Sequence, residues 1–388
     1  MTLLYVHVPF CVKKCDYCAF YSEALKIQKS SPENYLQGLE TEVKLRQQDA
    51  PQGVSSLFIG GGTPTALSVE ELSTLLGLIN TNFKFEECAE RTVEGNPGTL
   101  TLAKLNSLVA SGINRFSLGV QSFNDGLLSR IGRIHNSADI RESIRLIREA
   151  GLTNLNLDLM FGLPGQSLKD WERTIEEALS YIPEHLSVYG LMLEEGTPLY
   201  LKYNVQQSAG LGRHNTPILL PDDDLQAEMY FWAVERLKQR GYIHYETSNF
   251  CLPGYECKHN LGYWQGEDYL GLGPAAVSCL NDTRFTNVES ISEYLLMLAE
   301  GKRPIDMNLY EALTEREMIA ERVILGLRLA EGVNLETFKA DFGVNLTDIY
   351  SDVLERYLSE GVLLIQDGYL RLNKKFIFVA NSVLQDFV

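Results

Sequence analysis

Three cysteines near the amino terminus, Cys11, Cys15 and Cys18, lie within eight residues of one another. They follow a short apolar segment that is typical of a buried strand. Thiolates are soft ligands that suit iron–sulfur clusters or zinc. A [4Fe–4S] cluster ordinarily takes four thiolates, so three leave one iron without a protein ligand. The spacing therefore predicts a cluster with one open coordination position, where a small molecule can bind and react.

Two other interpretations of the thiols are a disulfide and a structural zinc site. A disulfide is disfavoured because the chain has seven cysteines, an odd number, and no sign of secretion. A structural zinc site with His7 as the fourth ligand stays open, since zinc accepts such a ligand set. Against zinc, His7 lies on the predicted strand itself, and a structural site usually brings a second close pair of ligands.

The composition limits the kinds of partner. The 388 residues suffice for one large domain and a smaller one, and 45% of them are hydrophobic. The net charge of −17 disfavours nucleic-acid binding. The chain contains no apolar run of about 20 residues, so no membrane span is predicted. The amino terminus lacks the features of a signal peptide. We expect a cytoplasmic protein with at most peripheral membrane association.

The first half of the chain alternates short apolar strands with helices. Capping residues mark the helix starts, and glycines mark several ends. The predicted strands cover residues 3–8, 55–60, 90–95, 115–120, 154–159 and 185–192. The predicted helix starts are Ser31, Ser68, Thr101, Ser137 and Ser167. Six such repeats imply a parallel sheet, whose ligands gather at the carboxyl ends of the strands.

Glycines and polar side chains gather at those predicted strand ends. Glycine permits close backbone approach, and exposed N–H groups can hold a carboxylate or ribose oxygens. The segments are Gly60 to Thr65, Glu94 to Pro97, Gly119 to Phe123 with Arg133 and His135, and Asp158 to Gln166. One such segment alone indicates a capped turn, but several at successive strand ends predict a shared binding site.

The middle of the chain contains two less regular segments. Residues 196–222 are rich in glycine and proline and predict a long loop, before a helix from Asp222 to Arg240. Further on, the segment from His259 to Trp264 predicts a loop that suits a flat aromatic ligand. Imidazole is a common axial ligand of haem iron. The alternative is that His259 is a packed, hydrogen-bonded residue, and Cys257 is a rival iron ligand.

The composition changes at about residue 305. A capping box from Thr314 to Glu317 predicts a helix to about residue 330. The segment from Val362 to Leu372 predicts a β-hairpin with an Asp-Gly turn. Helices with a small hairpin indicate a winged-helix-like module, and the chain's acidity favours docking or a lid role over DNA binding.

The Cys-x3-Cys-x2-Cys spacing resembles the signature of the radical S-adenosylmethionine (SAM) superfamily, in which the methionine moiety of SAM occupies the open iron. Together, the motifs resemble the oxygen-independent coproporphyrinogen III oxidase family of radical SAM proteins, and within it the haem-chaperone branch. This resemblance implies an α/β fold with a partial (β/α)6 barrel over residues 1–195. It also implies an α+β extension over 196–304 and a helical domain over 305–388.

The resemblance implies roles for particular residues. It makes Cys11, Cys15 and Cys18 the cluster ligands. The positions matching the SAM site are Tyr5, Gly61, Gly62, Thr63, Glu94, Gln121, Arg133 and Asp158, with Tyr17 where the oxidases carry a phenylalanine beside a second SAM. The positions matching the haem-contact signature are His259, Asn260, Tyr263 and Trp264.

Two features separate the branches of the family. The oxidases carry a fourth cysteine where this chain has Phe20, and the signature from His259 to Trp264 is typical of the chaperone branch. We therefore expect a protein that binds haem and hands it to respiratory haem proteins, with His259 as the leading haem contact. The alternatives are a coproporphyrinogen III dehydrogenase of porphyrin biosynthesis and another radical SAM reaction.

Overall fold

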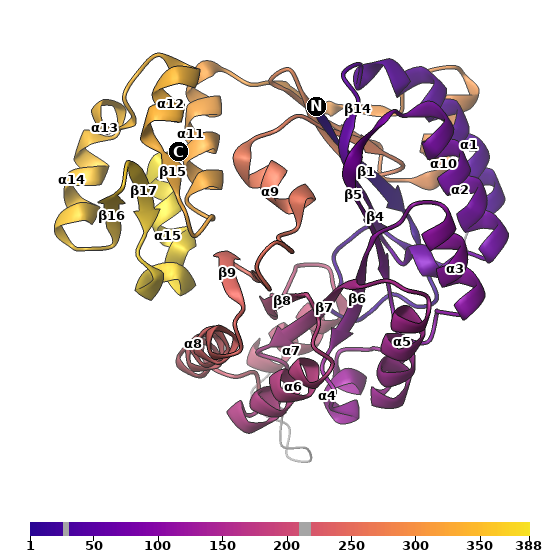
Figure 1. Ribbon diagram of the computed structural model, residues 1–388, viewed down its shortest axis with the longest axis horizontal. Helices are drawn as coiled ribbons and strands as arrows, with labels where there is room; N and C mark the ends of the chain where they lie inside the picture. Colours follow the sequence, from indigo (N-terminus) through magenta and orange to yellow (C-terminus); the bar gives the residue numbers. More distant parts are fainter. Residues whose placement is uncertain (26–30, 209–218) are drawn as a thin grey trace.

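The computed structural model of the chain describes residues 1–25, 31–208 and 219–388. Its main feature is a twelve-stranded sheet in the order β14-β13-β12-β11-β1-β4-β5-β6-β7-β8-β10-β9. A smaller domain, formed by the last part of the chain, lies beside one face of this sheet (Figure 1).

The predicted parallel sheet is confirmed. Its six consecutive strands are β1 (Thr2–Val8), β4 (Val54–Gly61), β5 (Phe85–Gly95), β6 (Arg115–Gln121), β7 (Asn154–Phe161) and β8 (His185–Gly190). The helices between them are α1 (Pro32–Arg46), α2 (Val69–Asn82), α3 (Leu102–Ala110), α4 (Asp125–Arg130), α5 (Ser137–Glu149) and α6 (Leu168–Ser180). The sheet is open at β14 and β9, as a partial barrel requires.

The capping signals mark where these helices begin. Ser31, Ser68, Thr101 and Ser167 each accept a hydrogen bond from a backbone N–H in the first turn of their helix. Helix α5 is capped by Asn136, one residue before the expected start. Each side-chain cap satisfies a backbone donor that the helix itself leaves unpaired.

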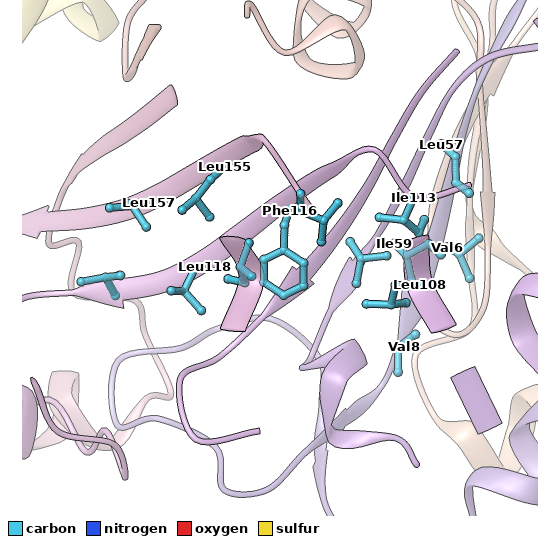
Figure 2. Packing of buried hydrophobic residues seen from close by; sticks show 14 of the residues in the cluster. Val6, Val8, Leu57, Ile59, Leu108, Ile113, Phe116, Leu118, Leu155 and Leu157 are labelled. Atoms are coloured by element: carbon cyan, nitrogen blue, oxygen red, sulfur yellow. The ribbon is translucent and has the colours of Figure 1, made fainter. Parts of the chain in front are cut away.

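The two faces of the parallel strands differ in polarity because side chains alternate along a strand. The outer face carries Val6, Ile59 and Leu118, which pack under the helices in the main hydrophobic core (Figure 2). The inner face carries polar and charged side chains, including Glu90 and Arg115, both almost fully buried. A second layer of protein therefore has to cover this inner face.

The segment after β8 lies beside the cysteine segment, since Leu199 N donates to Asp16 O at 2.8 Å. The structure places helix α7 at Pro198–Ser208, so the prediction of a loop there is wrong. Leu199 and Tyr203 of α7 are buried, and Thr197 accepts a hydrogen bond from Tyr200 N, so apolar contacts and a cap stabilise the helix. The rest of the predicted loop, residues 209–218, lies outside the described residues.

The extension continues the sheet at both edges. Its strands are β9 (Ile243–Glu246), β10 (Asn249–Cys251), β11 (Tyr269–Leu272), β12 (Val277–Leu280), β13 (Thr283–Asn287) and β14 (Ile305–Ala312). Its helices are α8 (Asp223–Gln239), α9 (Lys258–Gln265) and α10 (Ile291–Ala299). Because β14 pairs with β13, the sheet runs past residue 304, where we expected the extension to end. Residues 307–312 of β14 are exposed, so no buried apolar pattern marked it as a strand.

The last part of the chain forms a separate small core around Val323, Phe338 and Leu363. Its helices are α11 (Glu315–Gly326), α12 (Leu335–Phe342), α13 (Leu346–Ile349), α14 (Ser351–Ser359) and α15 (Ala380–Leu384), and its strands β15 (Val333–Asn334), β16 (Leu363–Gln366) and β17 (Tyr369–Leu372). The predicted hairpin is confirmed, with Asp367 and Gly368 both at positive φ as a type I′ turn requires. In the described part of the chain, no helix is both long and apolar enough to cross a membrane.

Candidate functional site

The three cysteines lie on the segment that leaves the carboxyl end of β1. Cys11 belongs to β2 (Phe10–Cys11), which pairs with β3 (Glu23–Ala24), and is buried, whereas Cys15 and Cys18 are half-buried. The backbone of this segment is fixed to the next strand end, because Thr63 N donates to Phe10 O at 2.7 Å. The thiols therefore sit at the edge of the sheet where the sequence predicted the chemistry.

A chain of hydrogen bonds connects two of the thiols. Thr63 Oγ1 donates to Cys11 Sγ at 3.5 Å, and Asn96 Nδ2 donates to Thr63 Oγ1 at 2.8 Å. Arg133 Nη2 donates to Asn96 Oδ1 at 2.7 Å, and Arg133 Nη1 donates to Cys15 Sγ at 3.4 Å. Donors aimed at sulfur stabilise thiolates and cluster sulfurs. Asn96 was not among the predicted site residues, although it belongs to one of the strand-end segments.

The surroundings of the thiols fit an anionic, sulfur-ligated group. The Nε atom of Arg133 is buried and has no hydrogen-bond partner among the described residues, so one donor of this cation is left for a ligand. Burial raises the pKa of the Cys18 thiol, and the neighbouring Cys15 and Cys11 raise it further. That mutual effect places the three sulfurs in one region.

The thiols are not yet gathered around a single point. Within the described residues, no group of three or more His, Cys, Asp or Glu side chains is arranged to hold a metal ion. The side chains between Cys11 and Cys15, which are Val12, Lys13 and Lys14, are all exposed. Moving this part of the loop therefore disturbs no core packing.

His7 makes a poor fourth metal ligand because both ring nitrogens already have partners. Its Nε2 donates to the Tyr21 carbonyl at 2.9 Å, and its Nδ1 lies 3.0 Å from the Tyr5 hydroxyl. The ring is only 4% exposed, and burial lowers its pKa. The zinc interpretation thus loses the residue on which it depended.

Most of the predicted SAM-site residues lie at neighbouring strand ends, whereas Tyr5 lies in the middle of β1. Gly61 ends β4 and Gly62 follows it, beside the cysteine segment, and a Cβ on Gly62 would lie 2.6 Å from Phe10 O. This glycine is needed for close backbone approach. Gln121 ends β6 at φ 65°, and Arg133 Nη2 also donates to the carbonyl of Gly119 on that strand.

Two carboxyl groups face the inner side of the same edge. Burial, and then the charge of Asp158, raises the pKa of Glu94 to about 8. Burial also raises the pKa of Asp158, which accepts hydrogen bonds from Asn156 Nδ2 at 2.7 Å and Ser117 Oγ at 3.3 Å. Such carboxyl groups can accept hydrogen bonds from hydroxyl or amino groups of a ligand.

Tyr17 is held in a small apolar cluster beside the cysteine loop. It packs against Leu127, Ile131, Met160 and Leu163. Burial raises its pKa, and the charge of Arg133 opposes that shift. Phe20, which stands at the position of the oxidases' fourth cysteine, is 72% exposed.

The predicted haem-contact residues lie on helix α9, so the expectation of a loop there is wrong. The helix begins after Cys257 and ends at Gly266 in the left-handed conformation. Glu90 of β5 accepts hydrogen bonds from Lys258 N at 3.2 Å and His259 N at 3.3 Å. A distant carboxylate thus caps the helix, which no local sequence signal could reveal.

His259 is packed and hydrogen-bonded, the alternative that the sequence left open. Its Nδ1 lies 2.7 Å from Ser56 Oγ, its Nε2 lies 3.1 Å from the Tyr263 hydroxyl, and its ring stacks on Phe58. The side chain is 1% exposed, and burial lowers its pKa to about 3. Cys257 is fully buried and donates to Glu90 at 3.3 Å.

The other two residues of the signature are only partly buried. Asn260 and Trp264 are both half-buried. The Arg328 guanidinium lies 5.5 Å from the centre of the Trp264 ring, so Trp264 contacts the C-terminal domain. The Trp264 Nε1 atom is buried without a hydrogen-bond partner among the described residues.

The cysteine loop and His259 lie towards opposite ends of the parallel strands. Ser56, which contacts His259, is near the start of β4, whereas Gly61, beside the cysteine segment, ends it. Along β5, Glu90 likewise lies on the side of His259, whereas Glu94 lies near the end of the strand on the side of the cysteine segment. The structure therefore brings the predicted cluster and SAM residues together, but keeps His259 apart from them.

A buried polar network on the inner face was missed by the sequence analysis. His185 Nδ1 donates to Asn156 Oδ1 at 2.7 Å, and the Tyr245 hydroxyl donates to His185 Nε2 at 2.8 Å. Cys257 N donates to the Tyr245 hydroxyl at 3.2 Å. Arg115, 2% exposed, lies 4.0 Å from Glu90 within the same network. Polar residues at every second position of β5, β6 and β7 were the available signal.

Two family models match the chain. The model described as the Radical SAM superfamily matches residues 5–178, which include the three cysteines and the strand ends. The model described as the HemN C-terminal domain matches residues 313–379. The boundary at 313 agrees with the end of β14 in the sheet.

Two similar proteins extend over nearly the whole chain. Heme chaperone HemW of Bacillus subtilis is 38% identical over 390 residues, covering 100% of this chain and 99% of the relative. Heme chaperone HemW of Lactococcus lactis is 34% identical, covering 99% and 96%. Among solved structures, coproporphyrinogen III oxidase HemN of Escherichia coli, a radical SAM enzyme, superposes with a TM-score of 0.85 at 25% identity, covering 100% of this chain and 89% of that one. By its full-length similarity to these relatives, the chain belongs to the heme chaperone HemW family of radical SAM proteins.

Proposed function

We propose that the chain is a cytoplasmic haem chaperone, which binds haem and delivers it to haem-accepting respiratory proteins. The observation that carries this proposal is the similarity over the full chain to relatives named heme chaperone HemW. The exposed Phe20, in place of a fourth cysteine, supports the chaperone over the oxidase.

Membership of the radical SAM family implies a [4Fe–4S] cluster and SAM. We assign the cluster to Cys11, Cys15 and Cys18. When bound, the cluster would supply one-electron chemistry to SAM. Around it, Arg133 and Thr63 donate hydrogen bonds to cysteine sulfurs, and the buried Arg133 Nε, which has no partner among the described residues, is a donor available to a carboxylate.

We assign the SAM pocket to the strand ends around this cluster. The residues are Tyr5, Tyr17, Gly61, Gly62, Thr63, Glu94, Gln121, Arg133 and Asp158. The raised pKa of Glu94, to about 8, favours its protonated form at neutral pH. A protonated carboxyl can both donate to and accept from a polar ligand.

We assign the haem contact to helix α9, through His259, Asn260, Tyr263 and Trp264. His259 Nε2 and the Tyr263 hydroxyl form a hydrogen-bonded pair on one face of this helix. His259 is buried behind Tyr263, so a haem iron could reach its Nε2 only by displacing the tyrosine hydroxyl.

The test is a titration of anaerobically reconstituted protein with haem, followed by absorption spectroscopy. We expect stoichiometric binding by the wild type and weaker binding or an altered Soret band in His259→Ala. The matched control is His244→Ala, because His244 is a half-buried histidine on β9 outside α9. A wild type that binds no haem would refute the proposal.

A second candidate function is coproporphyrinogen III dehydrogenase activity. The similarity of the fold to the HemN oxidase over the whole chain supports this candidate. An anaerobic assay with reductant, SAM and coproporphyrinogen III decides the matter by product analysis. Formation of protoporphyrinogen would establish the enzyme, and its absence from cluster-loaded protein would remove this candidate.

A further inference from the structure

A continuous chain of hydrogen bonds crosses the buried inner face of the sheet and reaches helix α9. It starts at the Asp158 carboxylate, which accepts from Asn156 Nδ2 at 2.7 Å. Asn156 Oδ1 accepts from His185 Nδ1 at 2.7 Å, and His185 Nε2 lies 2.8 Å from the Tyr245 hydroxyl. That hydroxyl accepts from Cys257 N at 3.2 Å. The chain of bonds therefore joins a residue of the assigned SAM pocket to the residue immediately before α9.

The sheet register fixes the middle of this chain of bonds. Asn156 of β7 lies opposite His185 of β8 and opposite Ser117 of β6, so the three side chains share one face. Ser117 Oγ accepts from Asn156 Nδ2 at 2.8 Å and donates to Asp158 at 3.3 Å. Asn156, His185 and Ser117 are at most 4% exposed. Neighbouring protein groups, rather than solvent, therefore decide how these side chains are oriented.

The chain of bonds has a defined direction. An ionised carboxylate only accepts hydrogen bonds, so Asp158 turns the amide nitrogen of Asn156 towards itself and the amide oxygen towards His185. Burial lowers the pKa of His185 well below its ordinary value, so the ring is neutral and carries one proton. That proton lies on Nδ1, facing the amide oxygen, and Nε2 accepts from the Tyr245 hydroxyl. The hydroxyl oxygen is then an acceptor for Cys257 N.

The far end of the chain of bonds fixes the start of α9. Tyr245 of β9 accepts from Cys257 N, and Glu90 of β5 accepts from Lys258 N and His259 N. Side chains of the sheet thus hold three consecutive backbone N–H groups, which a helix leaves unpaired at its start. The haem-contact signature follows directly on this helix, so a fixed start presents its side chains in one arrangement.

A second arrangement of the same groups follows when Asp158 stops being an acceptor. Burial raises the pKa of Asp158, so its neutral form costs less than it would in water. Beside a protonated carboxyl, the Asn156 amide can turn its oxygen to Asp158 and its nitrogen to His185. The neutral imidazole then carries its proton on Nε2, facing the Tyr245 oxygen, where it competes with Cys257 N. A ligand that donates to Asp158 therefore favours the arrangement that holds α9.

We propose that Asn156, His185 and Tyr245 are positioning residues that couple the SAM pocket to helix α9, so that bound SAM raises the affinity for haem. This inference rests on the proposed function and adds the regulation of its haem site. The hydroxyl and amino groups of SAM can donate to Asp158 and so keep that carboxylate an acceptor. By thermodynamic linkage, haem raises the affinity for SAM by the same factor. A carrier coupled in this way takes up haem most firmly when SAM is bound.

The experiment is a haem titration of the cluster-loaded protein with and without saturating SAM, followed by absorption spectroscopy. In the wild type we expect SAM to tighten haem binding by about fivefold or more, which is usual for coupled sites. Tyr245→Phe removes the hydroxyl and keeps the ring, so both ligands should still bind, but the effect of SAM should fall below about twofold. The matched control is Tyr242→Phe, which removes a buried hydroxyl that donates to the Pro183 carbonyl, outside the chain of bonds. It should keep the wild-type effect.

A measurement on the wild type alone decides the matter if Tyr245→Phe does not fold. Without haem, SAM should slow hydrogen exchange of the amides at residues 257–259 by about threefold or more. Unchanged exchange, or a haem affinity that SAM leaves unchanged or weakens, overturns this inference while the proposed function stands. An equal effect of SAM in Tyr245→Phe and the wild type overturns it as well. If the wild type binds no haem at all, the proposed function fails, and this inference fails with it.

Discussion

At the scale of single residues, Arg133 connects the cysteine loop to the strand ends. It donates to Cys15 Sγ and to Asn96, and it keeps a third donor unpaired. A hydrogen bond from a charged group contributes about 1.5–3 kcal/mol. For Arg133→Lys, which keeps the charge but not the planar array of donors, we expect about tenfold weaker SAM binding. Equilibrium binding of labelled SAM to the reconstituted protein measures this.

The control for this variant is Arg130→Lys, three residues earlier in the chain, at the end of α4. Arg130 donates to the carbonyl of Pro164 at 2.9 Å and contacts no cysteine. Its substitution should leave both SAM binding and iron content unchanged. Equal affinity of the two variants for SAM would show that Arg133 has no part in the pocket.

The individual site residues were predictable to different degrees. The thiols and the glycine-rich strand ends could be predicted because each group lies in one short segment of the sequence, where the residue types and their spacing are visible together. Asn96 and the capping role of Glu90 depend on partners 33 or more positions away in the chain. Contacts of that kind are set by the packing of whole strands, so spacing along the chain does not reveal them.

At the scale of elements, helix α9 is fixed to the inner face of the sheet by one carboxylate. Glu90 accepts hydrogen bonds from Lys258 N and His259 N and lies 4.0 Å from Arg115. Gly262 permits the close approach, because a Cβ there would lie 2.7 Å from Leu3 Cδ1. The position of α9 therefore depends on buried polar contacts as well as on apolar packing.

We expect Glu90→Gln to destabilise the protein by on the order of 2–4 kcal/mol. The substitution removes the negative charge at the helix start and leaves the Arg115 cation without its nearby carboxylate. Thermal unfolding and hydrogen exchange of the α9 amides measure the effect. Glu86→Gln, on an exposed position of the same strand, should change stability by less than about 0.5 kcal/mol. If the α9 amides of Glu90→Gln exchanged at the wild-type rate, the role of Glu90 in holding α9 on the sheet would be contradicted.

The elements differ in how clearly the sequence predicts them. The parallel strands and their helices were predicted because buried apolar runs and capping residues are local signals. Helix α7 was missed because glycines and prolines flank it, although Leu199 and Tyr203 anchor it in the core. Strand β14 was missed because an exposed edge strand needs no buried face.

At the scale of the whole molecule, the C-terminal domain docks through the same helix that carries the haem-contact signature. Arg328 stacks over Trp264, and Thr247 N donates to Arg328 O at 3.1 Å. Helix α9 thus lies between the sheet and the C-terminal domain (Figure 1). A ligand held beside α9 is positioned to affect how firmly that domain is attached.

Trp264→Ala should loosen this attachment while the cluster end of the barrel stays intact. Loss of a half-buried indole costs about 2–3 kcal/mol through lost apolar contact. We expect earlier unfolding of the C-terminal domain and faster limited proteolysis near residue 313, where the sheet ends. Iron content should equal that of the wild type, because the cysteines lie towards the other end of the strands. Trp264→Phe keeps a ring under Arg328 and should restore most of the protection. Unchanged proteolysis of Trp264→Ala, or a parallel loss of iron, would show that α9 does not couple the domain to the sheet in this way.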